Sequence, residues 1–159
     1  MNVTIVAVGR LKAGPERELV ARYLERAVAA GRRAGLTVQT RVLPESRAGS
    51  AEARCREEAD AILSVLPDDA RLVALDERGK PMTSDRFAGT IGQWRDAGIR
   101  DAVLAIGGAD GHGEAIRNAA TATLSFGAMT WPHQIARILA AEQVYRAVTN
   151  LTGHPYHRG

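Results

Sequence analysis

Short apolar runs rich in β-branched residues recur along the chain and predict the strands of a sheet. The clear runs are VTIVAV at 3–8, LTVQTRVL at 36–43, RLVALD at 71–76, RDAVLAIGG at 100–108 and TATLSF at 121–126. A further run, AMTW at 128–131, is weaker and predicts a short strand at its start.

Segments with helical spacing lie between these runs. Pro15 stands at the start of the first segment, which places Leu19 and Tyr23 on one face and closes at Gly31. The predicted helices span 15–31, 50–64 and 83–97, and a last long helix begins near Pro132. Because strands alternate with helices, the pattern predicts an α/β fold with a mainly parallel sheet flanked by helices on both faces.

The length of 159 residues suits one domain with a core of ordinary size, so we expect a single domain over residues 1–159. Aromatic residues make up only 4% of the chain, so its core must be aliphatic. The opening MNVTIVAVGR is too short in its apolar run for a signal peptide. No apolar run approaches the roughly 20 residues that a membrane span needs, so a cytoplasmic protein is expected.

The formal net charge of +3 permits a nucleic-acid partner without demanding one. Almost all the positive charge is arginine, with Lys12 and Lys80 the only lysines. A preference for bidentate phosphate contacts and a coding bias both explain this composition. Cys55 is the only cysteine, so one chain cannot form a disulfide or a cysteine-based zinc site. No histidine lies near Cys55 in the sequence, which disfavours it as a nucleophile.

Loops that follow three predicted strands describe a cleft for a small ligand. Ligands of parallel α/β sheets bind beyond the carboxyl ends of the strands. The loops are DERGKP at 76–81, GGADGHG at 107–113 and GAMTWPH at 127–133. Their glycines allow the backbone to approach a ligand closely. Met129 and Trp131 offer apolar surface that suits a purine ring and equally suits a core.

Two familiar phosphate-binding motifs are not matched. Gly79-Lys80 resembles part of a P-loop, but Ala74 stands where glycine is needed and Pro81 where serine or threonine is needed. The segment VGRLKAG at 8–14 lacks the dinucleotide fingerprint, which disfavours a nicotinamide enzyme. Taken alone, the segment 76–80 is interpreted as a polar turn in which glycine supplies a positive φ.

The last predicted helix carries an apolar stripe that includes Ile135, Ile138 and Leu139, broadened by Ala140 and Ala141. Small residues on a helix permit close approach of a neighbour. The stripe predicts either core packing within one chain or an isologous subunit interface.

The chain ends in GHPYHRG, which concentrates His154, Tyr156, His157 and Arg158 near the terminus. An ordinary frayed end is one interpretation of this segment. The other is a tail that closes over RNA, with Tyr156 stacked on an extruded base and Arg158 on a phosphate. Two histidines on such a tail make a poor metal site, so no metal is expected.

Several segments together resemble the ribosomal RNA large subunit methyltransferase H family of the SPOUT superfamily. They are AVGRLK, LDERGKPMTS, IGGADG, LSFGAMTWPHQIARILAAEQVYRA and HPYHR, and they extend from one end of the chain to the other. The resemblance implies a SPOUT-type fold with a carboxyl-terminal trefoil knot, a homodimer, and S-adenosylmethionine as cofactor. It also implies methyl transfer to N3 of a pseudouridine in helix 69 of 23S rRNA, with the assembled ribosome as the expected partner.

The resemblance places the cofactor in the same three loops. The predicted cofactor-binding residues are Leu75, Gly107, Gly108, Phe126, Gly127, Ala128, Met129, Thr130 and Trp131. The methyl donor is itself a cation, so we expect walls of glycine, backbone carbonyls and apolar side chains rather than arginine. No role is assigned to Asp110 or His112.

The resemblance and the side-chain chemistry also predict residues for the acceptor side of the reaction. The predicted catalytic residues are His154, Tyr156 and Arg158, and the predicted RNA-binding residues are His133, Glu142, Arg146 and His157. The imide proton of pseudouridine must be removed, and several groups are candidates for the general base. These candidates are His133, Glu142, His154, Tyr156 and His157. A Glu142–Arg146 pair is also consistent with a simple helix ion pair.

A second hypothesis is a non-catalytic module of the same fold that binds rRNA or the ribosome. Such a module would bind rRNA with a steep salt dependence and transfer no methyl group. The weak positive charge favours a small RNA contact per subunit, and therefore a preformed ribosomal surface as the substrate.

Overall fold

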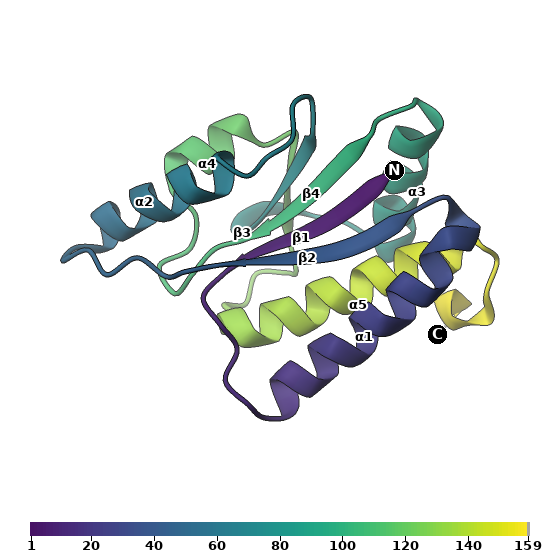
Figure 1. Ribbon diagram of the computed structural model, residues 1–159, viewed down its shortest axis with the longest axis horizontal. Coiled ribbons are helices and arrows are strands. Elements are labelled where there is room, and N and C mark those ends of the chain that lie inside the picture. Colours follow the sequence, from purple (N-terminus) through teal and green to yellow (C-terminus); the bar gives the residue numbers. More distant parts are fainter. Residues whose placement is uncertain (159) are drawn as a thin grey trace.

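The structure, a computed structural model, describes the backbone of residues 1–158 and the side chains of residues 1–156. Its centre is a sheet in the order β2-β1-β4-β3-β5, and each pair of neighbouring strands is parallel (Figure 1). The strands are β1 (Asn2–Val8), β2 (Thr37–Leu43), β3 (Arg71–Pro81), β4 (Asp101–Ile106) and β5 (Ala122–Ser125). The predicted parallel α/β architecture is confirmed.

The helices lie between the strands, as the pattern predicted. They are α1 (Pro15–Gly31), α2 (Ala51–Leu63), α3 (Ser84–Asp96), α4 (Glu114–Ala119) and α5 (His133–Leu151), with short 3₁₀ turns η1 (Arg32–Ala34) and η2 (Pro155–Arg158). Three of the helix starts have simple local causes. Pro15 occupies the first turn of α1, Ser50 Oγ accepts a hydrogen bond from the amide of Ala53, and Thr83 Oγ1 accepts one from the amide of Arg86.

Helices cover both faces of the sheet, and the core is divided accordingly. On one face, α1, α3 and α5 pack through side chains such as Ala27, Ile91 and Val144. On the other face, α2 and α4 pack through Ile62 and Ile116. Both cores are mainly aliphatic, as the low aromatic content predicted.

One predicted strand is absent, and one helix was not predicted. Residues 128–131, predicted as a weak strand, form no regular element. The helix α4 was missed, because its six residues are too few to display a helical repeat of apolar positions.

The polar segment after the third predicted strand continues β3 instead of leaving the sheet as a turn. Leu75 and Lys80 both pair with Leu124 of β5, so residues 76–79 bulge out between them. Gly79 does not have a positive φ, contrary to the prediction. Glycine is needed there because a Cβ would lie 2.7 Å from the backbone carbon of Leu124. We call residues 76–79 the β3 bulge.

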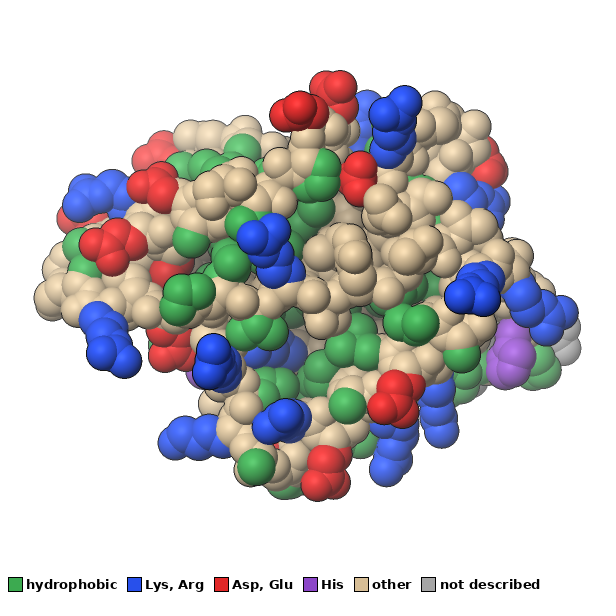
Figure 2. All heavy atoms as spheres, in the orientation of Figure 1, with side chains coloured by type: hydrophobic (Ala, Val, Ile, Leu, Met, Phe, Trp, Pro, Cys, Tyr) green, Lys and Arg blue, Asp and Glu red, His purple; other side chains and the backbone are tan. Residues whose placement is uncertain are grey.

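Charged side chains of both signs are mixed on the surface. Figure 2 shows Lys and Arg spread among Asp, Glu and apolar side chains on the face that it presents. This mixture agrees with the small net charge of +3. Within the described part of the chain, no helix has the length and apolar character needed to cross a membrane.

Candidate active site

A cleft of about 530 Å³ opens at the carboxyl ends of β4, β3 and β5, which are neighbours in the sheet. The loops that follow β4 and β5 line it together with the β3 bulge, so the predicted convergence of the three segments is confirmed. The lining residues are Leu75, Asp76, Glu77, Arg78, Ile106, Gly107, Gly108, Ala109, Asp110, Gly111, His112, Arg117, Ser125, Phe126, Gly127, Met129, Thr130, Trp131, Pro132, His133 and Ala136. The volume falls within the range of small-molecule sites, about 300–1,000 Å³.

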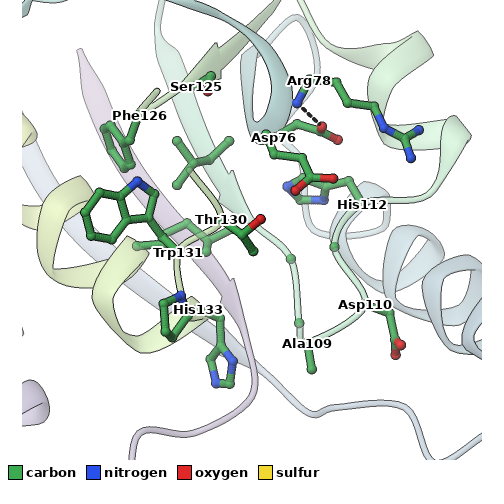
Figure 3. A pocket seen from close by; sticks show the side chains of 18 of the residues that line it. Asp76, Arg78, Ala109, Asp110, His112, Ser125, Phe126, Thr130, Trp131 and His133 are labelled. Carbon is green, nitrogen blue, oxygen red and sulfur yellow. Dashed lines mark hydrogen bonds between the residues drawn. The ribbon is translucent and has the colours of Figure 1, made fainter. Parts of the chain in front are cut away.

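One wall of the cleft is apolar. Phe126 and Trp131 lie on the same side in Figure 3, Leu75 lines the cleft from the residue before the β3 bulge, and Ile106 lines it from the end of β4. Trp131 is 43% exposed and Met129 is 73% exposed, which is unusual for such large apolar side chains. The prediction that these two residues offer apolar surface to a ligand agrees with their position at the cleft.

The opposite wall is polar and charged, which corrects the expectation of an uncharged cleft without arginine. Asp76 accepts a hydrogen bond from the amide of Arg78 at 2.9 Å, and its other oxygen lies 3.4 Å from Nη1 of Arg117. The Asp76 side chain is only 7% exposed, so the Arg117 cation compensates a carboxylate that has lost most of its water. Figure 3 shows Asp76, Arg78 and His112 together on the side facing Trp131.

His112 is a buried member of this polar wall. Its Nε2 donates to the carbonyl oxygen of Ala105 at 3.1 Å, which requires the Nε2–H tautomer. Burial lowers the pKa of His112, because the charged imidazolium would lose its solvation. The carbonyl contact and the nearby Asp76 oppose this shift. His112 therefore stays neutral at pH 7.

The sequence assigned no role to Asp76, His112 or Arg117. Asp76 could have been found from its place, because it is the last residue of the predicted strand RLVALD. His112 lies in a loop that follows a predicted strand, which is a weaker form of the same signal. Arg117 belongs to α4, which the hydrophobic pattern did not reveal, so the sequence carried no signal for it.

The segment 107–113, which we call the glycine loop, needs its glycines mainly for internal packing. A Cβ on Gly107 would lie 2.8 Å from the backbone of Gly111, and a Cβ on Gly108 would lie 2.8 Å from Oε2 of Glu58. Gly111 has a φ of 76°, which favours glycine for a conformational reason. The sequence suggested that these glycines leave room for a ligand. The structure shows a second reason for them, which is the close approach of the loop to itself and to α2.

The other predicted cofactor residues lie in or beside the cleft. Gly127, with a φ of 114°, turns the chain after β5 so that Thr130 lines the cleft. Ala128 is the one predicted cofactor residue that does not line it. His133, predicted to bind RNA, lies at the first turn of α5 and lines the cleft, where Figure 3 labels it.

The carboxyl-terminal tail follows the end of α5 (Figure 1) and packs against its second half, whereas the first turn of α5 lines the cleft. The Tyr156 hydroxyl donates to Oε1 of Glu142 at 3.1 Å, and its ring centroid lies 4.6 Å from that of Tyr145. Arg146 donates from Nε to the same Glu142 oxygen at 2.9 Å and lies 5.0 Å from the centre of the Tyr156 ring. The ion pair of the predicted i, i+4 type is therefore present, and it holds the tail.

The environment of Tyr156 keeps its phenol protonated. Burial, a hydrogen bond with Tyr23 and the negative charge of Glu142 raise the pKa of Tyr156 well above its ordinary value.

The Nδ1 of His154 accepts a hydrogen bond from the Tyr156 amide at 3.2 Å. The predicted residues His157 and Arg158 have side chains that lie outside the described residues.

About 14 Å along the helix axis separates His133 from Glu142, because they lie nine positions apart on a helix that rises about 1.5 Å per residue. His133 lies at the cleft, whereas Glu142, Arg146, His154 and Tyr156 lie along the second half of the helix and beyond it. One chain therefore does not bring the predicted cofactor residues and the predicted tail residues together.

Among the side chains that the structure describes, no group of three or more His, Cys, Asp or Glu residues could hold a metal ion. Cys55 is a free thiol.

Comparisons with known proteins match this arrangement to a family. The family described as "Predicted SPOUT methyltransferase" matches residues 1–157. The chain belongs to the SPOUT methyltransferase family. This result confirms the family and the methyltransferase class predicted from the sequence.

Full-length relatives bear a common name, "Ribosomal RNA large subunit methyltransferase H". The relative from Agrobacterium fabrum is 57% identical over 160 residues, which cover 99% of each chain. The relative from Methylorubrum populi is 56% identical over 161 residues, covering 100% of this chain and 98% of its own. The relative from Nitrobacter hamburgensis is 51% identical over 160 residues and covers both chains fully.

A solved structure, the SpoU methyltransferase AviRb from Streptomyces viridochromogenes in complex with AdoMet, has a TM-score of 0.41 and is 13% identical. The match covers 92% of this chain and 59% of that one.

Proposed function

We propose that this SPOUT family member is an S-adenosylmethionine-dependent enzyme that methylates N3 of a pseudouridine in helix 69 of 23S rRNA, in the cytoplasm and on the assembled ribosome. The observation that carries this proposal is the cleft at the ends of β3, β4 and β5, which gathers eight of the nine predicted cofactor residues. The shared name of relatives at 51–57% identity supports the rRNA substrate.

The residues that line the cleft fit S-adenosylmethionine. The wall of Leu75, Phe126 and Trp131 can pack against an adenine ring, and the glycine loop offers backbone groups to its polar edge. The polar wall contains carboxylates as well as guanidinium groups, which suits a ligand that carries an ammonium group, a carboxylate and a sulfonium. When bound, S-adenosylmethionine supplies an activated methyl group.

The residues of this chain contribute mainly by alignment. The cleft holds one reactant, and the acceptor nitrogen must approach along one line. Alignment of this kind lowers a barrier by about 7–11 kcal/mol. His133 lies at the cleft and is positioned to meet the acceptor from the first turn of α5.

Removal of the imide proton requires a base near the acceptor, which typically accelerates a reaction by about 10²- to 10⁴-fold. The raised pKa of Tyr156 makes its phenol a hydrogen-bond donor instead of a base. Glu142 accepts from both Tyr156 and Arg146 and is therefore engaged as an acceptor already. Among the predicted candidates with described side chains, His133 and His154 are the groups we propose as bases.

We propose a homodimer that is formed through α5. Ile135, Ile138 and Leu139 are only half-buried in one chain and share one face of the helix. A second copy related by a two-fold axis would place an antiparallel α5 against this face. Because the cleft borders the first turn of α5 and the tail packs on its second half, this pairing would bring each tail to the partner's cleft. We also expect the trefoil knot that the family resemblance implies.

The function is tested with methyl-labelled S-adenosylmethionine and three acceptors: naked 23S rRNA, isolated large subunits and whole ribosomes. We expect incorporation at one pseudouridine, with the highest rate on whole ribosomes. Binding of rRNA without transfer on any acceptor would favour the non-catalytic module instead.

Mixed dimers test whether the tail acts in the partner's site. One variant carries Gly107→Val, which blocks the glycine loop by sterics, and the other lacks residues 153–159. Each variant alone is expected to be inactive. Random mixing in equal amounts should restore about a quarter of the wild-type sites, because half of the dimers then contain one complete site. Lack of recovery in dimers shown to have exchanged subunits would contradict action in the partner's site.

A further inference from the structure

The glycine loop is held by a residue that lies outside the cleft. Arg54 of α2 makes two hydrogen bonds with Asp110, one from Nε to Oδ2 at 2.6 Å and one from Nη2 to Oδ1 at 3.0 Å. Paired bonds of this kind fix the orientation of both planar groups as well as their separation. Nη1 of Arg54 donates to the carbonyl oxygen of Ala48 at 3.1 Å, which also anchors the guanidinium to the segment before α2.

Neighbouring residues of α2 contact the same side of the loop. The Cys55 thiol lies 3.5 Å from the carbonyl oxygen of Asp110 and 3.8 Å from that of Gly111. Burial raises the pKa of Cys55, so the thiol remains a hydrogen-bond donor at neutral pH. Glu58, one turn further along, approaches Gly108 so closely that a Cβ there would lie 2.8 Å from its Oε2.

The second half of the loop has different supports. Nη1 of Arg117 donates to the carbonyl oxygen of His112, and the His112 ring is bound to the backbone of Ala105. These contacts attach His112 to α4 and β4. The first half, from Gly107 to Asp110, is contacted by side chains of α2.

From these contacts we infer that Arg54 and Asp110 are a positioning pair for the cleft. Ala109 and Asp110 line the cleft, whereas Arg54 does not. Without the ion pair, a loop rich in glycine would have more conformations to lose when a ligand binds, and affinity would fall. This inference rests on the proposed function, because the ligand whose affinity it concerns is S-adenosylmethionine.

Calorimetry with S-adenosylmethionine on the full chain tests the pair. Arg54→Ala and Asp110→Ala should each weaken binding by about 2- to 5-fold, which is the range measured for partly exposed ion pairs. Arg54→Ala/Asp110→Ala should bind no more weakly than either single variant, because the two residues act as one unit. Arg54→Lys, which keeps the charge but loses the paired geometry, should lie between Arg54→Ala and the wild type.

A control breaks an ion pair elsewhere whose arginine is similarly exposed, 27% for Arg95 against 30% for Arg54. Arg95 donates from Nε to Asp96 at 2.8 Å near the end of α3, on residues that do not line the cleft. Arg95→Ala should leave the affinity unchanged. Hydrogen exchange of the amides at 107–110 in the ligand-free protein should be faster in Arg54→Ala than in the wild type and the control. A general loss of folding would instead accelerate exchange throughout the core.

The outcomes separate this inference from the proposed function. If the wild type releases no binding heat and also transfers no methyl group, the proposed function fails. If the wild type binds and Arg54→Ala binds equally well, the positioning pair is refuted while the function stands. Additive effects of the two alanine substitutions would also refute it, because they would mean that Asp110 contacts the ligand independently of Arg54.

Discussion

The Tyr156 hydroxyl donates a hydrogen bond of 3.1 Å to Oε1 of Glu142, a residue of α5 that lies 14 positions earlier in the chain. The same oxygen accepts from Arg146. The tail is therefore attached to the second half of α5, whereas the first turn of α5 borders the cleft. Changes in the tail should therefore affect methyl transfer without affecting the binding of S-adenosylmethionine.

The first prediction concerns this contact. Tyr156→Phe removes the hydrogen bond and keeps the ring against Tyr145, so the free energy of unfolding should fall by only about 0.5–1.5 kcal/mol. Because the hydrogen bond holds the tail that carries the proposed base His154, methyl transfer should fall by about 2- to 12-fold, which is equivalent to the same 0.5–1.5 kcal/mol. Affinity for S-adenosylmethionine should be unchanged. Single-turnover transfer and calorimetry measure the two effects, and Tyr145→Phe is the control for the ring pair. Equal loss of binding and transfer would contradict the separation of roles.

The second prediction concerns pH. Because burial lowers the pKa of His112, the folded protein favours the neutral imidazole more than the unfolded chain does. The resulting stability is present above the unfolded pKa of about 6.5 and is lost as the pH falls through the lower folded pKa. Urea unfolding at pH 8 and pH 5 should show this loss. His112→Gln, whose amide can donate to Ala105, should show a smaller loss over the same interval. An equal loss in the variant would assign the pH dependence to other groups.

A third prediction uses the two tryptophans. Trp131 is 43% exposed at the cleft, whereas Trp94 of α3 packs against the core. Binding of S-adenosylmethionine should therefore change the fluorescence of Trp131 and leave that of Trp94 nearly unaltered. Trp131→Phe should abolish most of the change, and Trp94→Phe should preserve it. A signal that survives in Trp131→Phe would place the ligand elsewhere.

The fourth prediction compares two glycines. Gly107→Ala would put a Cβ 2.8 Å from the backbone of Gly111, so the loop must shift and donor affinity should fall by at least about 10-fold, equivalent to about 1.4 kcal/mol. Gly89→Ala on α3 meets no atom within 4 Å and should raise the free energy of unfolding by about 0.5–1 kcal/mol, with unchanged affinity. Calorimetry and urea unfolding measure both variants. Unchanged affinity in Gly107→Ala would show that the loop adapts.

The sequence alone determined the five strands and every helix except α4, because local periodicity encodes which face of each longer element is buried. It placed the start of α1 at Pro15, and it located the three segments that line the cleft, because parallel strands present their carboxyl ends at one edge of the sheet. The resemblance supplied the family, which the comparisons confirm.

Only the tertiary structure decided the rest. The ion pair of Arg54 with Asp110 joins residues 56 positions apart, and the separation depends on how α2 packs rather than on any local pattern. Leu124 pairs with both Leu75 and Lys80 because β3 bulges between them, and the hydrophobic periodicity of the sequence does not predict this bulge. The packing of Tyr156 against α5, away from its own cleft, follows from its side-chain contacts with Glu142 and Tyr145. Such contacts depend on three-dimensional packing, and a linear sequence pattern records them only where neighbours in space are also neighbours along the chain.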